Sequence, residues 1–308
     1  ETAFGKSMPY IAFEGTGGEW ILQDDLTSSS VINLTAGTLN TNNVTVTAQY
    51  LHSTGSNIRS LILGASVFNL NMSSWSTYAW RVEGSNVTVN AGTSTINLSG
   101  SPYPYFQASN FVYYNVNFTN QTATQANLIS NNAVFNNVTM AGDGNLSGSS
   151  TFNNLTLGTG KVTNLSGTQT VNGIFTCNGT CDIPAALNNG TISKTSGVVT
   201  VNYVNMQNVT AIGGATFNAS NSTNLGNNNG WNFLPISSQN LYWIGNGGNW
   251  TDASHWSLSS GGPASGCIPS PYDNVFFDVN SFTSGGQTIT INQTCLLYTS
   301  PSPRDRTR

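Results

Sequence analysis

The sequence predicts an all-β protein: a right-handed parallel β-helix (β-solenoid) followed by the truncated start of a second β module. The first observation behind this prediction is composition, because only 6% of the 308 residues are charged, against about 25% in a typical soluble domain. Asn, Thr, Ser and Gly fill the gap, and Asn and Gly tolerate the positive φ angles of tight turns. The second observation is a short strand motif that repeats along the chain.

Copies of this strand motif favour a solenoid over a β-sandwich. The segment VFNNVTM at 134–140 recurs as TFNNLTL at 151–157, and each copy alternates apolar and polar residues with a period of two. This alternation indicates a strand with one buried face. We therefore expect Phe135 and Phe152 to stack inward on neighbouring coils, and asparagines at matching turn positions to bond from coil to coil. Looser copies lie at 113–118 and 171–179, and further strands are predicted at 31–35, 43–48, 59–64, 86–90 and 94–100.

The pattern changes near residue 233, which divides the chain. Residues 1–233 form the predicted solenoid, and 234–240 have the character of a linker in which Pro235 breaks any strand ladder. Residues 241–294 are rich in Trp, Gly and Pro and then become strand-like, so we interpret them as the start of the second β module. The final segment, 295–308, resembles a translated sequencing adapter, so we expect it to be an artefact rather than part of the natural chain.

The charge and hydropathy of the chain argue against two classes of partner. The formal net charge is −4, with only 8 Lys and Arg. The chain thus lacks the basic face that binds phosphates, and we expect no nucleic-acid partner. No apolar run approaches the roughly 20 residues that span a bilayer, so we expect no membrane insertion in this fragment.

The carboxylates lack the pattern of a polysaccharide-cleaving β-helix, in which acids lie on adjacent coils about 20 residues apart. After Asp25, the acids of the predicted solenoid are Glu83, Asp143 and Asp182, each separated by roughly two coils or more. Four acids cluster within 14–25, where a calcium site is the alternative to a solvated turn. The alternating acidic loop of a calcium site is absent there. We therefore expect no catalytic residue, no metal site and no cofactor.

Aromatic residues are the candidates for ligand contact, because flat rings can stack on sugars. Rings gather at 73–80 and 101–106, and NWTDASHW at 249–256 places two tryptophans near the start of the second module. For both groups the alternative, which we favour, is that the rings fill a core or cap an apolar edge. Asp252 would then bond to backbone N–H groups two residues on. The candidate ligand-contact residues are Trp75, Trp80, Tyr103, Tyr105, Trp250 and Trp256.

Two cysteines lie close together in the segment CNGTC. A disulfide between Cys177 and Cys181 would close a small loop in an oxidising compartment. Two reduced thiols on one turn are the alternative, because sequence does not establish the geometry that a disulfide needs. A zinc site is disfavoured, since neither His52 nor His255 is near in the sequence.

Several stretches resemble one family. GTGGEWILQDDLT at 15–27, VNAGTSTINLSG at 89–100 and YWIGNGGNWTDASHW at 242–256 resemble the repeat modules of large secreted bacterial surface proteins, which are adhesin-like β-solenoids. The resemblance implies a non-catalytic structural or adhesive module at the cell surface or outside the cell. We expect such a module to present its turns and aromatic strips to a glycan, or to a host or neighbouring surface protein. The alternatives are a polysaccharide-active β-helix enzyme and a phage tail fibre component.

Overall fold

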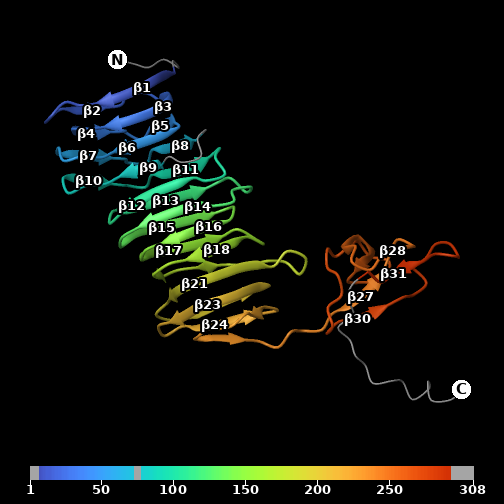
Figure 1. The fold of residues 1–308 in the computed structure, drawn as a ribbon. Coiled ribbons are helices and arrows are strands. Elements are labelled where there is room, and N and C mark those ends of the chain that lie inside the picture. The colour runs from blue at the N-terminus through green and yellow to red at the C-terminus, as the bar shows by residue number, and fades with distance from the viewer. Residues whose placement is uncertain (1–6, 73–77, 293–308) are drawn as a thin grey trace, which may run out of the picture. The chain divides into compact units, whose positions relative to one another are not determined.

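The computed structural model describes residues 7–72 and 78–292 and is all-β, with a parallel β-solenoid of about 11 turns (Figure 1). The expected solenoid fold is therefore confirmed. This part of the chain contains no α-helix, and its single 3₁₀ helix is Ala253–His255. The chain divides into two compact units. The solenoid contains the residues up to Gly179 and Pro184–Leu234, and the second unit contains Thr180–Ile183 and the residues from Pro235 onward.

The strands are short, and most are bounded by Gly, Asn or Ser turns. In chain order they are β1 (Met8–Phe13), β2 (Glu19–Ile21), β3 (Leu26–Leu34), β4 (Gly37–Asn40), β5 (Thr45–Ala48), β6 (Tyr50–Ser53), β7 (Arg59–Ile62), β8 (Val67–Asn71), β9 (Tyr78–Val82), β10 (Val87–Asn90), β11 (Thr95–Ser99), β12 (Tyr105–Ser109), β13 (Val112–Phe118), β14 (Ala126–Ser130), β15 (Ala133–Met140), β16 (Gly144–Ser147), β17 (Ser150–Leu157), β18 (Val162–Leu165), β19 (Thr168–Val171), β20 (Phe175–Thr176), β21 (Ala185–Ser193), β22 (Val198–Asn202), β23 (Val204–Ile212), β24 (Thr216–Ser220), β25 (Thr223–Asn224), β26 (Trp231–Phe233), β27 (Asn240–Trp243), β28 (Gly248–Asn249), β29 (Trp256–Ser257), β30 (Asn274–Phe276) and β31 (Ile289–Thr290).

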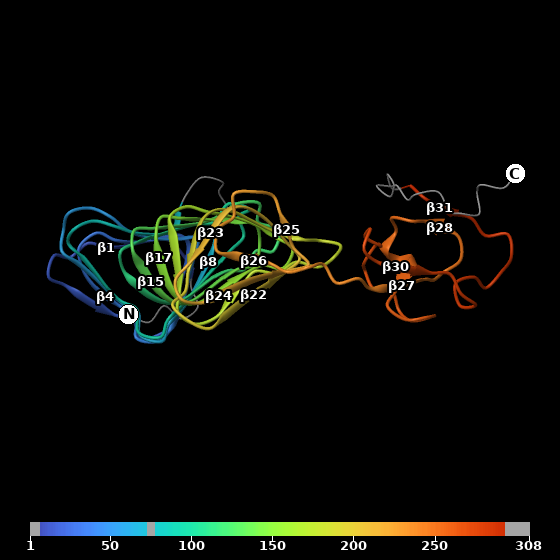
Figure 2. The same ribbon diagram turned by 90° about the horizontal axis from the view of Figure 1, so that it is seen from below.

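Strands of successive coils pair in parallel, so each wall of the solenoid is a parallel sheet (Figure 2). The first wall runs through β1, β3, β6, β9, β12, β14, β16, β18, β21 and β23. The second wall runs through β3, β5, β8, β11, β13, β15, β17 and β20. A third wall contains the sheet of β2, β4, β7 and β10 near one end. The sheet of β22, β24 and β26 continues the second wall, because Asn202 at the end of β22 pairs in parallel with Asn178, just after β20.

A column of stacked aromatic rings occupies the middle of the solenoid core. Phe135 and Phe152 are register partners on β15 and β17, and their buried rings stack at 5.3 Å with an interplanar angle of 13°. The inward stacking expected from the repeated motif is therefore confirmed. Tyr113 stacks on Phe135 at 5.6 Å, and Phe106 stacks on Trp80 at 5.7 Å. Large rings at equivalent inward positions thus fill the same space on successive coils.

Asparagine ladders connect the coils on the outer faces of the walls. In the second wall, Asn137 donates to Asn115 and Asn154 donates to Asn137, both at 2.8 Å. The amide both donates and accepts, so one residue type continues the ladder from coil to coil. The expected bonding between asparagines is confirmed, but these ladders lie within strands rather than at turns. One ladder does follow a corner, where Asn189, Asn208 and Asn227 all have positive φ.

Corner residues add ties between coils. The carboxylate of Asp25 accepts the backbone N–H of Thr45 at 2.7 Å, and that of Asp143 accepts the N–H of Val162 at 2.8 Å. The buried guanidinium of Arg59 donates to the carbonyl oxygens of Gly55, Asn57 and Glu83. These charged groups form hydrogen bonds with backbone N–H and carbonyl groups that have no partner in the strand ladders.

The second unit has its own small core of Leu241, Trp243 and Trp256. Strand β27 pairs antiparallel with β29 and parallel with β30. Asp252 caps the 3₁₀ helix, because its carboxylate accepts the backbone N–H of Ser254 at 3.0 Å. This bond to the residue two positions on is the one expected from the sequence.

Replacing Phe135 with alanine tests the aromatic column. Phe135→Ala should lower the free energy of unfolding by about 3–5 kcal/mol, because it leaves a cavity between two rings that have no room to collapse. Val134→Ala is the matched control, since Val134 lies on the same strand but is 41% exposed. Chemical denaturation of both variants measures the difference, and equal losses would contradict the inward column.

Candidate binding site

A group of half-buried aromatic and polar side chains lies on the outer face of the first wall. It consists of Tyr50 and His52 on β6, Tyr78 and Arg81 on β9, and Tyr105 on β12, and we call it the tyrosine surface. These strands are neighbours in the wall. Three successive coils therefore each present a tyrosine ring on the same face.

Strand alternation and one bulge give the tyrosine surface its geometry. In β9 both Ala79 and Trp80 are buried, and the register with β12 shifts at this point: Tyr78 pairs with Tyr105, but Trp80 pairs with Phe106. The extra residue accommodates Trp80 in the core and still returns the next side chain, Arg81, to the outer face. Without the bulge, Tyr78 and Arg81 would lie on opposite faces of the sheet, because they are three residues apart.

The rings and charges of this surface contact one another. The rings of Tyr78 and Tyr105 meet edge to face with centroids 5.5 Å apart. The guanidinium carbon of Arg81 lies 5.1 Å from the centroid of the Tyr78 ring, within reach of a cation–π interaction. Arg81 also forms an ion pair with Glu83 at 2.6 Å. These contacts hold the half-buried rings of Tyr78 and Tyr105 in place, beside Arg81 as a donor and Glu83 as an acceptor of hydrogen bonds.

A hydrogen bond to the backbone defines the tautomer of the His52 ring in the tyrosine surface. Its Nε2 lies 2.7 Å from the carbonyl oxygen of Tyr78. A carbonyl oxygen only accepts, so Nε2 carries the proton and donates it. Burial lowers the pKa of His52 from its ordinary value of 6.5, outweighing that hydrogen bond, which raises it. The neutral ring contacts Tyr50, with centroids 5.9 Å apart.

Of the ligand-contact candidates in the solenoid, Tyr105 and Tyr103 are half-buried, and Tyr105 belongs to the tyrosine surface. The ligand-contact prediction is wrong for Trp80, whose side chain is fully buried and donates to the Tyr113 hydroxyl at 3.2 Å. Trp75 lies outside the described residues. Sequence reasoning missed Tyr50 and its neighbours on β6, although the alternation in QYLHS was the available signal.

Trp256 belongs to the core of the second unit, and Trp250 packs against that core. Trp256 is fully buried, meets the half-buried Trp250 edge to face at 4.7 Å, and donates to the Trp250 carbonyl at 2.8 Å. The ring of Trp243 stacks on that of His255 at 4.6 Å. A sugar-stacking role is therefore wrong for Trp256, because no face of its ring is open.

Neither alternative for CNGTC, a disulfide between Cys177 and Cys181 or two reduced thiols, is correct. Cys181 forms its disulfide with Cys267, 86 residues away, and Cys177 is a free, buried thiol. Phe175 and Cys177 are both buried, two residues apart, as strand alternation requires. Cys181 lies instead in Thr180–Ile183, the segment that belongs to the second unit. Burial raises the pKa of Cys177 to about 12, so this thiol stays protonated.

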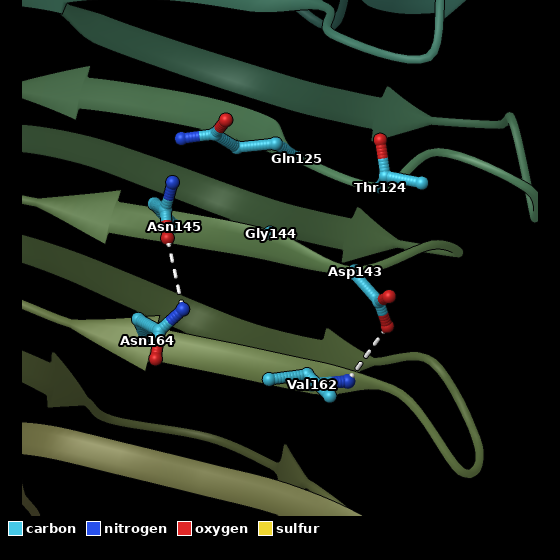
Figure 3. Close-up of a pocket in the computed structure, with 7 residues that line it drawn as sticks. All are labelled: Thr124, Gln125, Asp143, Gly144, Asn145, Val162 and Asn164. Carbon is cyan, nitrogen blue, oxygen red and sulfur yellow. Dashed lines mark hydrogen bonds between the residues drawn. The ribbon is translucent and has the colours of Figure 1, made fainter.

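A shallow hollow of about 260 Å³ lies farther along the first wall (Figure 3). Its lining includes Asn145 and Asn164, whose amides bond to each other at 3.2 Å, and Asp143. Asp143 is the only ionisable side chain of the seven that line it, and its carboxylate already accepts from Val162. Paired acid–base chemistry needs a second titratable group, which this lining does not supply.

Metal and cofactor ligands do not gather elsewhere in the described part of the chain. No group of three or more His, Cys, Asp or Glu side chains suited to a metal ion is found among residues 7–72 and 78–292. Within the same residues, no helix is long and apolar enough to cross a membrane.

Comparison with known proteins gave no match: neither a family model, nor a curated protein, nor a solved structure resembles this chain closely enough to be assigned.

Lowering the pH should destabilise the solenoid through His52. Because the folded-state pKa lies below 6.5, the unfolded chain binds the proton more tightly than the folded one. The contribution of His52 is therefore fully present above that value and is lost as the pH falls toward the folded-state pKa. Urea unfolding at about pH 7 and about pH 5 should show a smaller pH-dependent loss for His52→Gln than for the unmodified protein. Equal losses would contradict this assignment.

Peptide mapping under non-reducing conditions tests the cysteine pairing. The peptides that contain Cys181 and Cys267 should elute as one cross-linked species, and reduction should separate them. Cys177 should resist alkylation until the protein is unfolded, because its thiol is buried and protonated. A cross-linked peptide containing Cys177 would overturn the pairing.

Proposed function

We propose that the solenoid is a non-catalytic structural and adhesive module that binds glycan through the tyrosine surface. On the resemblance drawn from the sequence, the module belongs to a secreted or surface-anchored bacterial protein. Its walls serve as a rigid support on which surface side chains recur from coil to coil.

The row of outward tyrosines is the observation that carries this proposal. Tyr50, Tyr78 and Tyr105 lie on three successive coils of the first wall. Neighbouring strands lie about 4.8 Å apart, so the rings extend over the length of a short saccharide. An aromatic ring offers an apolar face to the C–H groups of a sugar, and the phenol hydroxyl offers a hydrogen bond at the edge.

Polar groups beside the rings support recognition of hydroxylated ligands. Arg81 supplies donors, Glu83 supplies an acceptor, and Gln107 is the register partner of Arg81 on the next coil. An amide, a guanidinium and a carboxylate near flat rings match the mixture of C–H faces and hydroxyl groups of a sugar.

The placement of the carboxylates supports a non-catalytic role. The carboxylates of Asp25 and Asp143 accept backbone N–H groups of the next coil, and that of Glu83 pairs with Arg81. A glycosidase needs two carboxyl groups on either side of the scissile bond, roughly 5–10 Å apart. Single carboxylates that form hydrogen bonds from one coil to the next are better suited to a structural stalk than to a hydrolase.

Glycan binding by tyrosine variants tests the proposal. The full chain is applied to a glycan array, and the saccharide bound best is then titrated calorimetrically against Tyr78→Ala and Tyr105→Ala. Each variant should raise Kd about tenfold, or about 1.4 kcal/mol, because a stacking face is lost. Tyr272→Ala is the matched control, since Tyr272 is 60% exposed but lies in the second unit.

Three outcomes would count against the proposal. They are an absence of glycan binding, unchanged affinity in both tyrosine variants, and release of shorter saccharides from the bound ligand. The last outcome would favour the polysaccharide-active enzyme instead.

A further inference from the structure

The second wall carries two rows of side chains, nearly all of them small and polar, on its outer face. The inner row has a Thr or an Asn on eight consecutive coils, and every step is a register pair of adjacent strands: Thr27, Thr47, Asn69, Asn97, Asn117, Thr139, Thr156 and Thr176. The outer row lies two residues earlier on six of these strands, and Val67 is its one apolar member: Thr45, Val67, Thr95, Asn115, Asn137 and Asn154. We call these two rows the Asn/Thr array.

The array is regular in both directions. Along the solenoid its groups repeat at the strand spacing of about 4.8 Å, and along each strand residues i and i+2 are about 6.6 Å apart. The bounding inward residues are buried, as Phe68, Ile96 and Val116 illustrate, so the array rests on a packed core. Apart from Val67, it is a two-dimensional lattice of hydroxyl and amide groups on a firm support.

Hydrogen bonds hold the amides of the array in fixed orientations. In the inner row, Asn97 donates to Asn69 and Asn117 donates to Asn97, both at 3.0 Å. In the outer row, Asn115 donates to the Thr95 hydroxyl at 3.2 Å. Each ladder bond uses one N–H of an amide that has two and one lone pair of an oxygen that has two. The remaining donors and acceptors repeat with the same period and are available to ordered water.

The chemistry of the array matches a neutral partner. The strands that carry it contain no charged residue, and neither row contains an aromatic ring. A charged ligand would find no counter-charge there, and a sugar would find no ring on which to stack. The partner that matches this face in charge and in hydrogen bonding is therefore itself an uncharged lattice of donors and acceptors.

We propose that the Asn/Thr array binds ice, through a layer of water that its hydroxyl and amide groups order. In hexagonal ice, oxygen atoms repeat along one axis at a distance close to the spacing of neighbouring strands. Waters held at successive coils therefore fit a growing crystal face without displacement. The site lies on the second wall, whereas the tyrosine surface lies on the first, so ice binding is independent of the glycan proposal.

Incorporation into ice tests this inference. The fluorescently labelled full chain and labelled serum albumin are each exposed to a slowly growing ice hemisphere, and the label inside the ice is measured. The chain should enter the ice and albumin should be excluded. Thr139→Lys, in the centre of the inner row, should reduce incorporation at least tenfold, because a long charged side chain disrupts the ordered water layer. Thr47→Lys, elsewhere in the same row, is the second variant.

Matched controls separate loss of the site from loss of the fold. Thr88→Lys adds the same side chain on β10 of the third wall, where Thr88 is exposed, and should incorporate like the unmodified chain. Tyr105→Ala should also incorporate normally. Circular dichroism melting identifies any variant that does not fold.

Three results would overturn the proposal. They are exclusion of the unmodified chain from ice, undiminished incorporation of both folded array variants, and retention on crystalline cellulose or chitin in place of ice. The last result would assign the array to a polysaccharide surface.

Discussion

The parallel register between coils is the constraint on which the rest of the solenoid depends. Side chains alternate with a period of two, so a slip of one residue would turn every buried side chain outward. The stacked rings of Phe135 and Phe152 oppose such a slip from inside. The amides of Asn137 and Asn154 oppose it from outside, because they bond only when the coils are aligned. Both faces of the same strands therefore select one register.

Register also explains the composition. When coils align, each outward position becomes a row of like residues about 4.8 Å apart. Rows of one charge would repel, whereas an amide donates to one neighbour and accepts from the other without repulsion. Asn and Thr are therefore suited to the outer face of a solenoid, and the carboxylates of Asp25 and Asp143 lie at its corners. The two proposed surfaces arise in the same way, as rows of tyrosine on one wall and of Asn and Thr on another.

The coils depart from a regular repeat in three ways: in their length, at a bulge and at a corner. Equivalent ladder residues are 17 positions apart between β15 and β17 but 28 apart between β8 and β11, and turns absorb the difference. The bulge in β9 seats Trp80 in the core and places Tyr78 and Arg81 on the outer face. Arg59 fills a corner by bonding to three carbonyl oxygens.

The sequence by itself determined the solenoid, the stacking of Phe135 on Phe152 and the bonding of asparagines between coils, because these follow from a period-two pattern that repeats along the chain. It also indicated the turn role of Asp252. Features that depend on irregularities of the strands, or on pairs of residues far apart in the sequence, were decided only by the tertiary structure. The bulge buried Trp80, Cys181 found its partner 86 residues away, and alignment of single strands created the tyrosine surface and the Asn/Thr array. The local alternation of residues specifies whether a side chain points into the core or outward. Which side chains lie beside it on the neighbouring coils depends on how many residues each coil contains.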